Sequence, residues 1–316
     1  MPANFTQGWF GNGQPAWHGQ GVVTEGTLPA REAFATADAL FEVEKRQLSY
    51  PVHGDEGQVI KFQPADIYGL VRKDTDNFLG AVSERYQIVQ NTSLLRMAEF
   101  IREEADLESV VVLEGGAKVA FTAALRGASA DIVAGDTVKR RLVGYLGHDG
   151  KTGLGAIFTN IRVVCSNTLA GALKDNGAKT SITHKGDAES KFDKLIRSID
   201  ISRQSFTAEC SYMRELATRE ITPDLFREFV DRVYEVKEGD VFRKRQKLER
   251  AFRYGMGASF APNTIWNAVN AVTEVETSPL NKTAVNARKM FKSANFGAGL
   301  NYSKRASSVA RELVGI

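Results

Sequence analysis

The stretch that decides the fold of the first half of the chain is TVKRRLVGYLGHDGKTGLGAIFTNIRVVC, residues 137–165. Two apolar, β-branched runs, Thr137–Leu146 and Gly153–Cys165, flank the tetrapeptide HDGK at 148–151. An Asp-Gly pair between alternating runs indicates a hairpin, because a tight primed turn needs a positive φ, which glycine tolerates best. The stretch therefore predicts an antiparallel β-hairpin that turns at residues 148–151.

The expected register is the same whether the loop of this hairpin contains two residues or four. Tyr145 is then opposite Leu154, and Arg141 is opposite Phe158. Because side chains alternate along a strand, one face, called the predicted platform below, collects Lys139, Arg141, Tyr145, Phe158, Asn160 and Arg162. The other face collects Val138, Leu142, Ile157, Ile161 and Val163, with Arg140 as the exception, and is expected to face the core.

The composition of the predicted platform is typical of a surface that binds single-stranded nucleic acid. Cations neutralise phosphates, and ring faces stack on unpaired bases without reading sequence. Arg126 and Lys151 are expected to add further cations. Two alternatives stay open: the polar side of the sheet simply faces water, or a register shifted by one residue exchanges the two faces.

Composition and charge limit the class of protein. The chain has 316 residues, enough for one large domain or two modest ones, with 43% hydrophobic and 25% charged residues. A net charge of +3 does not by itself indicate a polyanionic partner, so only local clusters of cations are informative. No apolar run has membrane-spanning length, and the N-terminus lacks the pattern of a secretory signal. Two cysteines, Cys165 and Cys210, fit a reducing compartment, so a cytoplasmic location is expected.

The pattern along the chain predicts an α+β protein in three parts. Residues 1–38 are rich in glycine and aromatic residues and are expected to form an irregular N-terminal arm that docks through its rings. Residues 39–185 are expected to form an antiparallel-sheet domain with packed helices, including a helix at 93–105 and a hairpin around Glu114-Gly115-Gly116. Residues 186–316 show helical periodicity and are expected to form a helical domain.

Within the helical part, the run from Arg243 to Arg253 carries six cations and one acid, Glu249. On a helix, Leu248, Ala251 and Phe252 would face inward. The cations would then form either a solvated helix face or a second strip that contacts phosphates.

Motifs of covalent chemistry are missing from the sequence. The four histidines, His18, His53, His148 and His184, have no zinc-ligand spacing, and His148 is expected to be exposed in its turn. The segment GHDGKT resembles the end of a P-loop but links two strands. We therefore expect no catalytic residue, no metal and no cofactor, although folding could still bring Glu114, Asp136 and Asp149 together.

Several segments resemble an uncharacterised family encoded on prophages, plasmids and phage genomes. They are PAWHGQG near the N-terminus, then FLGAVSERYQIVQN, GGAKVAFTAAL, DTVKRRLVGYLGHDG, FTNIRVVCSNTLAGAL and TIWNAVNAVTEVE. The block Arg162–Leu169 is the most specific, and the resemblance spans nearly the whole chain. Where relatives often carry Asp-His, this chain has Glu276-Thr277-Ser278. The resemblance implies a mobile-element origin and no particular activity.

The order of hairpins, a helix and a helical C-terminal part is also similar to phage single-strand annealing proteins of the RecT, Redβ and ERF types. This likeness implies a protein that binds and anneals single-stranded DNA in homologous recombination, without covalent chemistry. It also implies a homo-oligomer, as a ring or filament, with a host single-strand-binding protein as a further partner. The alternatives are a metal-dependent nuclease of a mobile element and a protein-binding module that acts on a host factor.

Overall fold

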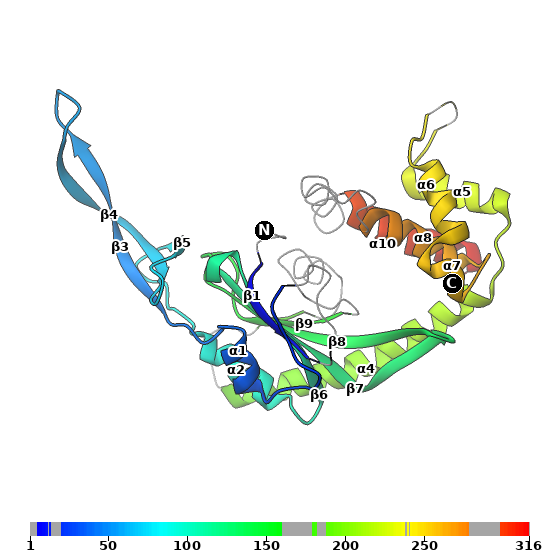
Figure 1. The fold of residues 1–316 in the computed structure, drawn as a ribbon, viewed down its shortest axis with the longest axis horizontal. Helices are drawn as coiled ribbons and strands as arrows, with labels where there is room; N and C mark the ends of the chain where they lie inside the picture. The colour runs from blue at the N-terminus through cyan, green and yellow to red at the C-terminus, as the bar shows by residue number, and fades with distance from the viewer. Residues whose placement is uncertain are drawn as a thin grey trace. The chain divides into compact units, whose positions relative to one another are not determined.

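The computed structural model describes residues 5–11, 13, 20–159, 179–181, 188–237, 239, 241–277 and 298–315 (Figure 1). The chain is α+β, as predicted. It divides into two compact units: Met1–Arg126 with Arg141–Asp200, and Gly127–Arg140 with Ile201–Ile316. The sequence placed its boundary at residue 185, whereas this division also assigns the tip of a hairpin to the second unit.

The main element of the first unit is a seven-stranded sheet with the strand order β10-β9-β8-β7-β6-β1-β2. Its strands are β1 (Phe5–Phe10), β2 (Val22–Val23), β6 (Ala105–Leu113), β7 (Lys118–Val133), β8 (Asp136–Gly147), β9 (Gly155–Thr159) and β10 (Lys179–Ser181). The β6–β7 hairpin turns at Glu114-Gly115-Gly116 as predicted, and both glycines have positive φ. Strands β7 and β8 run across the division between the two units.

The N-terminal segment differs from the irregular arm that the sequence predicted. Strand β1 pairs antiparallel with β6 and parallel with β2. Trp9 and Phe10 are fully buried, and the Trp9 indole donates a hydrogen bond of 3.0 Å to Thr24 Oγ1. The Trp9 and Phe10 rings therefore belong to the core of the sheet, and the glycines around them obscured the alternating pattern of a strand in the sequence.

The β8–β9 hairpin exists as predicted, but its register is shifted by one residue. Arg141 pairs with Thr159, Leu142 with Phe158, and Tyr145 with Gly155. Gly150 has a φ of 74°, as the turn requires. The expected pairs Arg141–Phe158 and Tyr145–Leu154 were therefore wrong, and the faces are exchanged for the second strand.

A three-stranded antiparallel sheet completes the first unit, with the order β3-β4-β5. It contains β3 (Val43–His53), β4 (Val59–Arg72) and β5 (Phe78–Val82), which lie within the antiparallel-sheet region predicted over residues 39–185. Gly80 of β5 meets the β8–β9 loop so closely that an added Cβ would lie 2.5 Å from the carbonyl carbon of Asp149. Helix α1 (Ala30–Thr36) packs Phe34 against Phe121 of β7, and α2 (Asn91–Phe100) follows β5.

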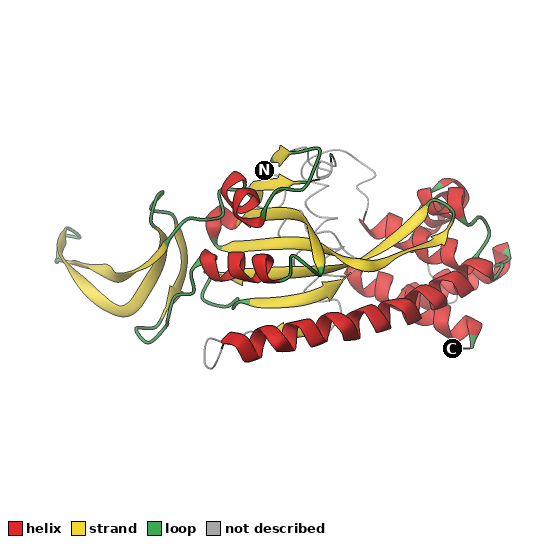
Figure 2. Ribbon diagram, turned by 90° about the horizontal axis from the view of Figure 1, so that it is seen from below, coloured by secondary structure: helices red, strands yellow, loops and turns green. Residues whose placement is uncertain are grey.

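The second unit contains most of the described helices, drawn in red in Figure 2. They are α4 (Ala188–Thr218), which begins in the first unit, α5 (Pro223–Tyr234), α6 (Arg245–Tyr254), α7 (Met256–Phe260), α8 (Ile265–Thr277) and α10 (Ala298–Val314). Thr222 caps α5, since its Oγ1 accepts from the Leu225 N–H. The core includes Phe226 stacked on Phe252 at 4.2 Å. None of the described helices is long and apolar enough to cross a membrane.

Candidate nucleic-acid interface

The register shift removes the aromatic part of the predicted platform. Phe158 lies opposite Leu142, and its side chain is only 1% exposed. Tyr145 is half-buried: its ring packs over Gly155, where an added Cβ would lie 2.4 Å from the phenol oxygen. Burial raises the pKa of the Tyr145 phenol. Phe158 and Arg141 therefore occupy opposite faces of the sheet, not one surface.

The Arg141 guanidinium is used inside the sheet. Its Nε donates to Glu108 Oε2 at 2.6 Å, and the two side chains are 14% and 9% exposed. Glu108 belongs to β6, and β7 lies between β6 and β8, so the pair spans the middle strand. The cation of a buried ion pair of this kind is already paired and is not offered to a phosphate.

The other cations of the prediction are spread over the two units. Arg126, in the first unit, is exposed and bonds Asp106 at 2.6 and 3.0 Å and the Glu103 carbonyl at 2.9 Å. Lys139 is exposed and belongs to the second unit. Asn160 and Arg162, like the RVVCSNTL block and Cys165, lie outside the described residues.

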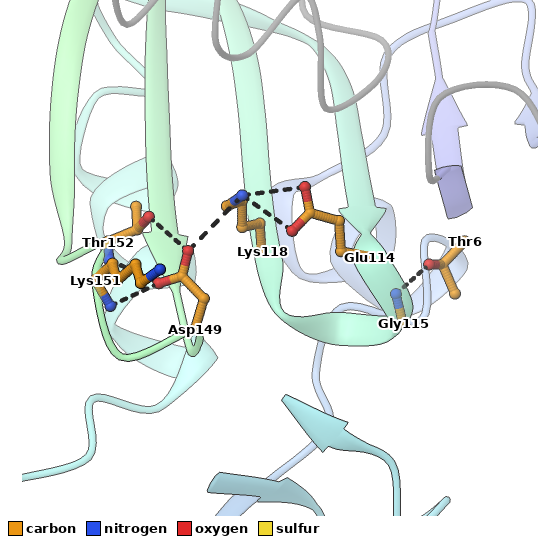
Figure 3. Close-up of polar contacts among 7 residues, drawn as sticks. All are labelled: Thr6, Glu114, Gly115, Lys118, Asp149, Lys151 and Thr152. Carbon is orange, nitrogen blue, oxygen red and sulfur yellow. Dashed lines mark hydrogen bonds and ion pairs between the residues drawn. The ribbon is translucent and has the colours of Figure 1, made fainter. Parts of the chain in front are cut away.

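Lys151 lies exposed in a loop that the Asp149 carboxylate organises (Figure 3). Asp149 Oδ1 accepts from the backbone N–H of Lys151 at 2.9 Å and of Thr152 at 2.7 Å, and Oδ2 accepts from the Thr152 hydroxyl at 2.9 Å. Burial opposes ionisation, but these donors and Lys118 outweigh it and hold the pKa of Asp149 below its usual value. The loop is therefore a preformed structure stabilised by an ionised carboxylate.

Lys118 connects this loop with the β6–β7 turn. Its ammonium lies 3.0 and 2.9 Å from the two Glu114 oxygens and 3.7 Å from Asp149 Oδ2. Figure 3 shows the three side chains converging, and the Gly115 N–H beyond them donates to Thr6 Oγ1 at 2.8 Å. Glu114 and Asp149 are therefore brought near each other, one of the arrangements left open by the sequence, and Lys118 lies between them.

Asp136, the third carboxylate that folding could have brought to Glu114 and Asp149, does not join them. It belongs to the second unit and accepts a hydrogen bond of 2.8 Å from the Trp266 indole. Among the residues that the structure describes, no group of three or more His, Cys, Asp and Glu side chains is arranged to hold a metal ion.

His148 is buried, contrary to the exposed position expected for it. Its side chain is 1% exposed, and its Nε2 lies 2.9 Å from Asn91 Oδ1. Asn91 is itself fixed because its amide donates to the Phe41 carbonyl at 3.1 Å. Burial lowers the pKa of His148 to about 4, against the weaker opposing charge of Asp149. His148 is therefore a neutral, structural side chain, and only the long-range packing of α2 could have revealed it.

Helix α6 and the residues before it carry several exposed cations. Leu248, Ala251 and Phe252 are buried, as predicted. On the opposite side, Lys247, Arg250 and Tyr254 follow one another at helical spacing. The α6 face, as used below, comprises these three residues with their exposed neighbours Arg243, Gln246 and Arg253. Tyr254 is 79% exposed, so its ring is accessible to another molecule.

The α6 face contains no acidic residue. Nearby carboxylates pair with cations at the inner border of the helix or on its neighbours: Glu276 with Lys244 at 2.6 Å, Asp231 with Arg245, and Glu249 with Arg227 at 3.9 Å. Among the described residues, no carboxylate forms an ion pair with Arg243, Lys247, Arg250 or Arg253, and these four side chains are exposed. Such a one-signed strip favours binding of a polyanion.

A buried carboxylate that the sequence analysis missed fixes the start of α6. Glu276 of α8 is 3% exposed and accepts from the Lys244 ammonium and the Tyr234 hydroxyl, each at 2.6 Å. Burial, together with the hydrogen bond to Glu276, raises the pKa of Tyr234 far above its ordinary value, so the phenol stays protonated. The sequence feature that could have revealed this buried carboxylate is a glutamate at the end of the apolar stripe of α8. Through its bond to Lys244, Glu276 holds the start of α6 against α8.

Comparison with known proteins gives a family and no activity. The family model described as "Domain of unknown function (DUF932)" matches residues 78–289, more than half of the chain. The chain belongs to the DUF932 family. No curated protein and no solved structure matches it. The described part of the match includes β5 to β9 and the α6 face, so both candidate surfaces belong to the family domain.

Proposed function

We propose that this DUF932 protein binds single-stranded DNA through the α6 face and anneals strands in the recombination of a phage or plasmid, without covalent chemistry. The observation that supports the proposal is the α6 face itself: four exposed cations and an exposed tyrosine ring, with no acid among them. Cations on such a strip neutralise phosphates, and an exposed ring stacks on an unpaired base.

The proposal keeps the chemistry that the sequence suggested and changes its location. Phe158 and Arg141 are committed to the core and to an ion pair, so they do not contribute. Lys139 is an additional exposed cation of the same unit as α6. The annealing activity and the mobile-element origin are supported by the resemblance of the segments and of the fold order to phage proteins. Annealing also requires several copies along one strand, hence a homo-oligomer.

Binding is tested by fluorescence anisotropy with a labelled oligothymidylate across a salt series. We expect affinity to fall steeply with salt, and Lys247→Ala with Arg250→Ala to reduce the log–log slope by about 1.4, since each phosphate contact contributes about 0.7. The matched control is Arg227→Ala with Arg232→Ala, which removes two cations of α5 that are paired with Asp224 and Glu312. Equal slopes for both double variants contradict the proposal.

The annealing step is tested separately with two complementary labelled strands. The wild-type protein should accelerate duplex formation, and the Lys247→Ala, Arg250→Ala variant should not. Cleavage of either strand that a chelator abolishes would instead favour the metal-dependent nuclease. Binding without acceleration would leave a single-strand-binding protein that does not anneal.

A further inference from the structure

Two aromatic rings and a buried carboxylate hold the ammonium of Lys244 at the start of α6. The ammonium lies 5.4 Å from the ring centroid of Tyr234, of α5, and 5.3 Å from that of Tyr302, of α10. It also donates to Glu276, of α8, at 2.6 Å. Ring faces attract an ammonium group within about 6 Å of their centroids. Tyr234, Tyr302 and Glu276, called the Lys244 cage below, therefore form a site for one cation.

The three consecutive cations at the start of α6 have different environments. Arg243 is exposed and belongs to the α6 face, whereas Lys244 and Arg245 are partly buried. Arg245 donates to Asp231 of α5, and Lys244 donates to Glu276 of α8. Both inner cations are thus paired with carboxylates of neighbouring helices. The Lys244 ammonium is committed to its cage and not to a phosphate.

Helix α6 depends on such a contact because its own sequence starts it poorly. Lys244 occupies the N-cap position, its side chain forms no capping hydrogen bond, and the first turn contains no acidic residue. The positive end of the helix dipole instead meets the cations Arg243 and Arg245. With ten residues, α6 is also too short to be stable without packing. The position of its first turn therefore depends on side chains that are bound to other helices.

We propose that Lys244 is a positioning residue for DNA binding: bound in its cage, it fixes the first turn of α6 in the orientation that presents Arg243 and Lys247 to the strand. Arg243 directly precedes Lys244, and Lys247 lies three residues after it. A turn that is already ordered loses less conformational entropy when a ligand binds, so preorganisation increases affinity. This inference rests on the function proposed above for the α6 face.

The first test measures the affinity of the purified Glu276→Gln variant for labelled oligothymidylate by fluorescence anisotropy. Positioning and simple charge predict opposite signs for this substitution. Removal of a carboxylate makes the protein more cationic, which by itself strengthens binding of a polyanion. Loss of the Lys244 contact should instead weaken binding, by about three- to tenfold, because the first turn must then be ordered on binding.

Lys244→Met is the second test, because it keeps an apolar side chain against the rings and removes the ammonium. It should weaken binding by the same factor without changing the log–log salt slope, whereas loss of a direct phosphate contact would reduce the slope by about 0.7. Combined with Glu276→Gln, it should weaken binding no further, since both substitutions break the same contact. A slope reduced by that amount overturns the assignment of Lys244 as a positioning residue.

The matched control is Glu108→Gln, which removes one carboxylate and breaks a buried ion pair with Arg141 in the other unit. It should lower stability but change the affinity for DNA by less than about twofold. Circular dichroism checks that all variants fold. Equal weakening by Glu108→Gln and Glu276→Gln would show a general effect of destabilisation and overturn the inference.

The proposed function and this inference fail in different ways. A wild type that does not bind DNA refutes the proposed function. A wild type that binds, together with a Glu276→Gln variant that binds equally or more tightly, overturns only the role of Lys244.

Discussion

The β8–β9 hairpin and helix α6 are both rich in cations, yet Arg141 of the hairpin and Arg250 of α6 have opposite environments. In the hairpin, Arg141 pairs with Glu108 and both side chains are largely buried. In α6, Arg250 and Lys247 point outward from a helix whose other side is buried. The difference shows that a run of cations predicts charge but not availability. Availability depends on whether a carboxylate from a distant strand reaches the cation.

The sharpest test of this comparison makes the same substitution in both regions. Arg141→Ala leaves Glu108 buried without its partner and should lower the free energy of unfolding by about 3–5 kcal/mol. Arg250→Ala removes an exposed side chain and should change the free energy of unfolding by less than about 0.5 kcal/mol, while weakening DNA binding. Chemical denaturation measures both. Equal losses of stability would show that Arg250 is also a structural residue.

The hairpin turn should also make stability depend on pH. The pKa of His148 is about 4 in the folded protein, below its ordinary value of 6.5. The unfolded chain therefore takes up this proton first, so the contribution of His148 to stability is complete above pH 6.5 and falls as the pH drops toward 4. The total loss should be about 3 kcal/mol.

Denaturation midpoints between pH 4 and 7 measure this dependence, with His148→Gln as the comparison. The variant should be less stable at pH 7 but should lose less stability on acidification. A wild-type curve with the same slope as the variant would mean that His148 is accessible to protons in the folded state. The α6 face contains no histidine, so its substitutions should leave the slope unchanged.

A smaller loss of stability than that of Arg141→Ala is expected from a substitution at the contact between the β8–β9 loop and β5. Gly80→Ala places a Cβ against the Asp149 backbone, which cannot retreat like a flexible side chain, and should destabilise by about 1–3 kcal/mol. The control is Gly26→Ala, because nothing lies within 4 Å of a Cβ at that position. Thermal unfolding of the two variants measures the difference. Equal melting temperatures would mean that the loop and β5 separate readily.

Predictions from the sequence were correct where the periodicity of apolar residues or a turn residue such as glycine was sufficient to define the structure. The α+β class, the hairpins around Gly115 and Gly150 and the buried side of α6 were all predicted. A helical face is fixed by 3.6-residue periodicity, and an error of one residue moves it only slightly. In a strand the same error exchanges the two faces, which is why Phe158 was assigned to the wrong surface.

The sequence by itself determined which segments form strands and helices, and that α6 has one apolar and one cationic side. Only the tertiary structure decided which cations remain exposed, because Glu108 reaches Arg141 from a strand 33 positions earlier in the chain. It also decided that His148 is neutral, since α2 brings Asn91 to the imidazole. The physical reason is that burial and pairing depend on contacts between distant residues, whereas periodicity depends only on the geometry of neighbouring ones.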